Sequence, residues 1–127
     1  MEKLTPTHLD AYTLAELGAE ARHLLFAGDI AGLSQRFGYA LAFGRDPADA
    51  IRDELASCLA HAGAVRLVAG GWETPCVSYF KPNGNGLLAL VECFAPTDKG
   101  TSLRIELIVT SNSTEIHAIL EQLSPAV

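Results

Sequence analysis

The chain has 127 residues and a formal net charge of −6, and this length suits one domain with its own hydrophobic core. Its hydrophobic fraction of 49% excludes a disordered chain, which would be poor in apolar residues. The nine Lys and Arg residues form no basic run, and an acidic chain repels phosphate groups, so nucleic acids and anionic membrane surfaces are poor partners. We therefore expect a single domain over residues 1–127 whose partner is a basic protein.

The cysteines and the N-terminus both indicate a cytoplasmic protein. Cys58, Cys76 and Cys93 show no paired spacing, which argues against a disulfide framework and for a reducing compartment. The segment from Met1 to Pro6 lacks the basic start and apolar centre of a signal peptide. The longest apolar run, Leu87 to Val91, is too short to span a bilayer.

Three helices are predicted before Gly63, where the hydrophobic period changes. Apolar residues recur every three to four positions over residues 6–27 and 30–43, which is the spacing of a buried helix face. The third helix has the clearest start, because Asp46 can cap it and proline suits its first turn. We expect this helix to cover residues 47–62, with Gly63 ending it.

Short apolar runs with a period near two follow Gly63 and predict strands. The gaps between them are too short for the crossover that a parallel pair requires, so we expect a four-stranded antiparallel meander in chain order. The predicted strands cover residues 64–69, 76–80, 87–94 and 102–109.

The end of the chain is predicted to be a helix. Asn112 and Glu115 have the N-x-x-E spacing that resembles a capping box. The apolar residues that follow are spaced i, i+3, i+4 and i+7, and Pro125 ends the pattern: Ile116, Ile119, Leu120 and Leu123. The fold class is therefore α+β, with three N-terminal helices, a four-stranded meander and one C-terminal helix, the helices lying mainly on one sheet face.

Two features suggest a protein-binding surface. An acidic cluster occupies the start of the third helix, and the only tryptophan, Trp72, lies in a loop of hairpin length, where such residues can be binding hot spots. The alternatives are a solvated helix face that compensates the helix dipole and a ring folded back over the core edge; a weak divalent-metal site at the acidic cluster is a further alternative. The partner-binding residues predicted here are Asp49, Asp53, Glu54 and Trp72.

We find no motif for catalysis, cofactor binding or a metal site. Cys58 and His61 could both face one side of the third helix, but a structural zinc site needs four ligands and no second pair exists. The glycine-rich segment from Gly84 to Gly86 precedes a strand rather than a helix, so it predicts a turn and not a phosphate site. The sequence therefore predicts no enzyme, no cofactor and no metal.

Three functions fit these features. The first is an inhibitor or immunity-type protein that occludes a basic toxin or nuclease, with an acidic face steering association. The second is a small secretion or assembly chaperone, acidic and possibly a homodimer. The third is a small-molecule-binding domain or minor enzyme with a pocket between helices and sheet near Tyr79 and Glu92.

Overall fold

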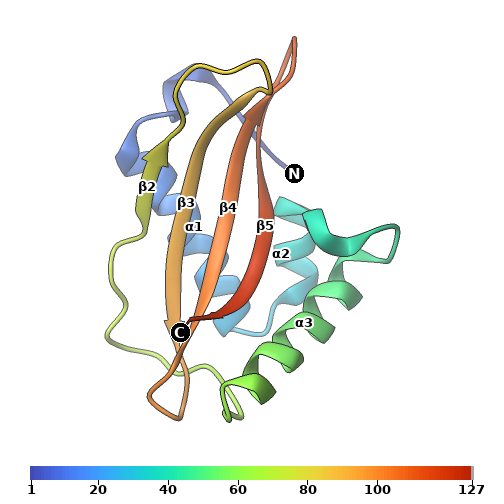
Figure 1. Cartoon of the computed structure of the whole chain (residues 1–127), viewed down its shortest axis with the longest axis vertical. Coiled ribbons are helices and arrows are strands. Elements are labelled where there is room, and N and C mark those ends of the chain that lie inside the picture. The colour runs from blue at the N-terminus through green and yellow to red at the C-terminus, as the bar shows by residue number, and fades with distance from the viewer. Residues whose placement is uncertain (127) are drawn as a thin grey trace.

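The computed structural model describes residues 1–126, and they form a layer of helices against one five-stranded antiparallel sheet (Figure 1). Two 3₁₀ turns, η1 and η2, interrupt the helical half of the chain. The elements in chain order are β1 (Glu2–Leu4), η1 (Pro6–His8), α1 (Ala11–Phe26), α2 (Ile30–Phe37), η2 (Ala40–Ala42), α3 (Pro47–His61), β2 (Cys76–Tyr79), β3 (Leu87–Pro96), β4 (Ser102–Ser111) and β5 (Ile116–Ala126).

The sheet has the strand order β1-β5-β4-β3-β2, with every neighbouring pair antiparallel. Strands β2 to β5 form a meander, and β1 extends the sheet along the outer edge of β5. The α+β class and the antiparallel sheet are thus confirmed. The predicted number of strands is wrong, because a strand at each end of the chain joins the sheet and the predicted strand over residues 64–69 does not form.

The predicted C-terminal helix is wrong, because these residues form β5. The Asn112 side chain does cap a turn, but the turn belongs to the β4–β5 hairpin. Its Oδ1 accepts hydrogen bonds from the backbone N of Thr114 at 2.9 Å and of Glu115 at 2.8 Å. The N-x-x-E pattern therefore marks a hairpin loop that offers the same local hydrogen bonds as a helix cap.

A β-bulge explains the misleading apolar spacing in β5. Glu106 of β4 pairs with Gln122, whereas the next residue, Leu107, pairs with Leu120, so Glu121 is an extra residue. The bulge lengthens the step between the buried Leu120 and Leu123 from two to three residues. A strand that contains such a step imitates part of a helical period.

Three further predicted elements differ from the structure. Residues 64–69 contribute only an isolated bridge, Leu67 to Thr97, instead of a full strand. The first predicted helix is divided, because Asp10 accepts from the backbone N of Thr13 at 3.0 Å and caps a new helix there. The second ends at Phe37, since Gly38 has the positive φ of +67° that stops a helix.

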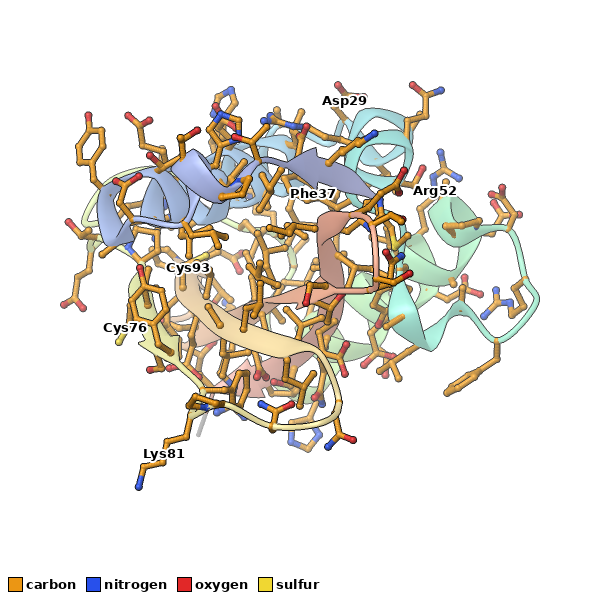
Figure 2. The ribbon with its side chains drawn as sticks, turned by 90° about the horizontal axis from the view of Figure 1, so that it is seen from above. Asp29, Phe37, Arg52, Cys76, Lys81 and Cys93 are labelled. Atoms are coloured by element: carbon orange, nitrogen blue, oxygen red, sulfur yellow. The ribbon has the colours of Figure 1, made fainter. Side chains whose placement is uncertain are left out.

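The core lies between the helices and the inner face of the sheet. Alternate residues of β3, β4 and β5 point towards the helices, among them Val91, Leu107 and Leu120, and all three are fully buried. Figure 2 shows Phe37 and Cys93 between the two layers, with Asp29 and Lys81 at opposite outer sides. The helices leave the other face of the sheet uncovered (Figure 1).

We expect Gly86→Ala to destabilise the fold by about 2 kcal/mol or more. Gly86 has φ +72°, and a Cβ atom there would lie 2.2 Å from the backbone O of Ser111. Gly84 is the matched control in the same loop, because its added Cβ meets no atom within 4 Å and its φ is not positive. Urea unfolding of both variants measures the difference, and equal midpoints would contradict this account of the loop.

Candidate functional site

The acidic start of α3 is a charged surface with its own counter-charges. Asp46 caps the helix by accepting from the backbone N of Asp49 at 3.1 Å. The Asp49 carboxylate pairs with Arg52 at 3.1 Å, and Asp53 pairs with Arg45 in the preceding loop. Both pairs are largely exposed, so solvent screens them and they contribute little to stability.

Glu54 lies apart from the other predicted acidic residues, because its half-buried side chain faces Cys58 and Tyr39. The Cys58 Sγ lies 3.6 Å from its Oε1 and donates to it. Burial, with a smaller contribution from Glu54, raises the pKa of Tyr39 to about 12. Glu54 therefore belongs to the inner side of α3, while Asp49 and Asp53 belong to the outer side.

Trp72 is folded back onto α1. Its ring meets Phe26 edge to face with centroids 5.3 Å apart, and the Arg22 guanidinium carbon lies 5.0 Å from the ring centroid. Its Nε1 donates to the Val68 carbonyl at 3.3 Å. Because its partners come from α1 and its own loop, Trp72 does not share a patch with the acidic residues of α3.

Phe43 is the residue that the sequence analysis missed. Its side chain is 83% exposed, and its backbone is left-handed, with φ 51° and ψ 50°. This conformation is unusual for a bulky residue, since Cβ approaches the following carbonyl. The predicted helix over residues 30–43 included Phe43. The feature that could have identified this residue is its position as an aromatic residue between the end of one helix and the cap of the next.

The loop that carries Phe43 is joined to α3. Arg45, two residues further on, holds Asp53 in an ion pair. Leu41 and Phe43 are therefore exposed apolar residues of the segment that leads into the charged start of α3. We call the exposed apolar residues of this segment and the acidic residues at the outer side of α3 the Phe43 surface: Leu41, Phe43, Asp46, Asp49 and Asp53.

Tyr79 and Glu92, the alternative pocket residues, lie on opposite faces of the sheet. Tyr79 is opposite Ala89, whose side chain is in the core, and its hydroxyl donates to the Leu9 carbonyl at 2.6 Å. Glu92 lies on the uncovered face, 3.7 Å from Arg104. The structure therefore does not bring them together in one pocket.

A hollow of about 240 Å³ lies between α1 and the loop that leads into β2. Arg22 contributes to its lining and is only 4% exposed. Aromatic rings and carboxylates complete the lining, which includes Tyr12, Glu16, Trp72, Glu73 and Pro75. This is the one place where a deeply buried charged side chain meets a concave surface among residues 1–126.

Residues 1–126 contain no group of three or more His, Cys, Asp or Glu side chains placed to hold a metal ion. Within the same range, none of the helices has both the length and the apolar character needed to cross a membrane. The chain matches no protein-family model, and no curated protein or solved structure is detectably similar to it. Function must therefore be argued from the geometry of these surfaces.

We expect Trp72→Ala to lower the free energy of unfolding by about 2 kcal/mol, since it removes packing against Phe26 and Arg22. Phe43→Ala should change it by less than about 0.5 kcal/mol, because the ring is exposed and packs on little. Urea denaturation of the two variants measures the contrast. A larger loss for Phe43→Ala would show that its ring supports the fold.

The thiols give a second test. Burial raises the pKa of Cys58 to about 12 and that of Cys93 to about 11, whereas Cys76 is exposed. A thiol reagent at mildly alkaline pH should therefore modify Cys76 alone in the folded protein, since the thiolate is the reactive form. All three should react in denaturant. Rapid modification of Cys76→Ser would contradict the burial of the other two thiols.

Proposed function

We propose that this chain is a small acidic binding protein that occludes a basic protein partner, such as a toxin or nuclease, through the Phe43 surface. The observation that carries the proposal is the exposure of Phe43 on a left-handed backbone, in the loop that the Arg45–Asp53 ion pair joins to α3. Aromatic side chains are enriched at the centres of protein–protein interfaces, whose rims are polar.

The ring supplies the apolar part of the proposed interface. Exposed apolar area of this size gains free energy only when a partner covers it. Residues held in uncommon backbone regions cost about 1–3 kcal/mol and cluster at ligand-binding segments. The exposed ring and its uncommon backbone conformation favour Phe43 over Trp72 as the hot-spot residue, because the Trp72 ring already packs on Phe26 and Arg22.

The carboxylates of Asp49 and Asp53 supply the electrostatic steering of the proposed interface. Asp49 and Asp53 are on the outer side of α3, and the chain carries a net charge of −6. An acidic protein accelerates its encounter with a basic partner through long-range attraction, which salt screens over about 10 Å at moderate ionic strength. The ion pairs with Arg45 and Arg52 orient these side chains without removing the acidic field of the whole molecule.

The proposal places the protein in the cytoplasm. Cys58, Cys76 and Cys93 are all free thiols, and free thiols persist where the compartment is reducing. The exposed Cys76 would be open to oxidation elsewhere. The free thiols support this location independently of the Phe43 surface.

Association kinetics with a basic protein encoded beside this chain's gene would test the proposal. The double reversal Asp49→Lys and Asp53→Lys should slow association about tenfold at low salt and much less at high salt, because the change acts on steering. The matched control is Glu16→Lys with Glu20→Lys, an equal charge change at the same i, i+4 spacing on α1. Equal slowing by both double variants would contradict a localised docking surface.

Phe43→Ala should act on dissociation instead. Loss of a hot-spot ring costs about 2 kcal/mol, so the dissociation constant should rise roughly thirtyfold with little change in association. Tyr12→Ala is the matched control, since Tyr12 is 73% exposed on a different part of the surface. An unchanged dissociation rate for Phe43→Ala would remove the ring from the interface.

A further inference from the structure

The hollow between α1 and the 72–75 loop has a cation in its lining with unused hydrogen-bonding capacity. Arg22 Nη1 donates to the carbonyls of Glu73 at 2.9 Å and Phe94 at 3.2 Å. Arg22 Nε is buried and has no acceptor. Within residues 1–126, no carboxylate lies within ion-pair distance of this guanidinium.

A buried charge without a counter-ion is costly. The free-energy cost of removing a guanidinium from water is offset when an opposite charge and hydrogen-bond acceptors lie next to it. Here two backbone carbonyls and the face of Trp72 compensate only in part. A planar carboxylate is the ligand group that the guanidinium geometry fits best.

The rest of the hollow does not suit a simple anion. Glu16 and Glu73 are exposed residues of the same lining, and their carboxylates would repel a second negative charge. The Glu16 carboxylate also raises the pKa of the neighbouring Tyr12. A cation alone would be favoured by these carboxylates and repelled by Arg22.

A ligand that pairs with Arg22 and also with Glu16 and Glu73 must carry one negative and one positive group. Between the charged groups, Tyr12, Trp72 and Pro75 offer apolar surface. A volume near 240 Å³ is just below the size range of ordinary small-molecule pockets, so the ligand must be small. These features together describe a compact zwitterion with an apolar substituent.

We propose that this hollow binds a free α-amino acid with an apolar side chain. Its carboxylate faces Arg22, its ammonium group faces Glu16 and Glu73, and its side chain packs on Trp72 and Pro75. The site is distinct from the Phe43 surface, so either proposal can fail without the other.

Trp72 is the only tryptophan of the chain, so its emission reports directly on the hollow. L-leucine is the first probe, followed by the other standard apolar amino acids. We expect one of them to change the emission saturably at concentrations below about 10 mM. The matched probes for leucine are 3-methylbutylamine, which lacks the carboxylate, and 4-methylpentanoate, which lacks the ammonium group. Both should bind at least tenfold more weakly.

Variants of the rim separate binding from folding. Glu16→Gln and Glu73→Gln should each weaken binding of the amino acid severalfold while the binding of 4-methylpentanoate improves, because a repulsive charge is removed. Glu20→Gln, an exposed carboxylate one turn along α1, should change neither. Arg22→Gln should abolish binding of the amino acid. If this variant does not fold, the two rim variants and the two leucine analogues still test the proposal. No saturable change with any apolar amino acid, or equal binding of leucine and its two analogues, would overturn the proposal.

Discussion

The packing of helices against one face of the sheet is the constraint on which the rest of this structure depends. Residues at alternate positions of the long strands β3, β4 and β5 point into a common core, where Val91, Leu107 and Leu120 meet the helices. All three α-helices precede the main meander in the chain, so they must fold back over a sheet that is made later. The connection from α3 to β2 runs along α1: Trp72 packs on Phe26 in the last turn of that helix, and the hollow extends from there towards Tyr12 in its first turn.

Arg22 joins three segments at that point. It belongs to α1, and its Nη1 binds a carbonyl in the loop before β2 and another on β3. Trp72 packs on its guanidinium and on Phe26. A charged residue thus performs a structural task at the core edge with only part of its hydrogen-bonding capacity, since its buried Nε has no acceptor.

The sequence predicts an element well when its signals are local. The helix α3 begins after Asp46 and reaches His61, since a cap and a proline fix its start and a glycine follows its end. The strand β5 could not be predicted in this way, because the extra residue at Glu121 is visible only against its partner strand. Its edge partner β1 has three residues and no periodicity to detect.

The candidate site shows the same division between local and tertiary information. The acidic residues of α3 could be identified from their positions, and Asp49 and Asp53 do lie on its outer side. Whether Trp72 or Phe43 is presented to a partner depends on tertiary contacts. Trp72 finds Phe26 and Arg22, whereas Phe43 sits on a left-handed turn that leaves its ring in solvent. No sequence pattern distinguishes these outcomes.

The uncovered sheet face does not compete strongly with the Phe43 surface as a docking site. Its apolar row, Leu90, Ile108 and Ile119, is in register across three strands and is already half-buried by its neighbours. Glu92 and Glu106 lie directly opposite one another, an unfavourable pairing that Arg104 offsets at 3.7 and 3.5 Å. Phe94 on the same face is 37% exposed, less than half the exposure of Phe43. One face of an antiparallel sheet is commonly solvated. The exposed ring of Phe43 has no comparable compensation, and for that reason the binding proposal rests on the loop before α3.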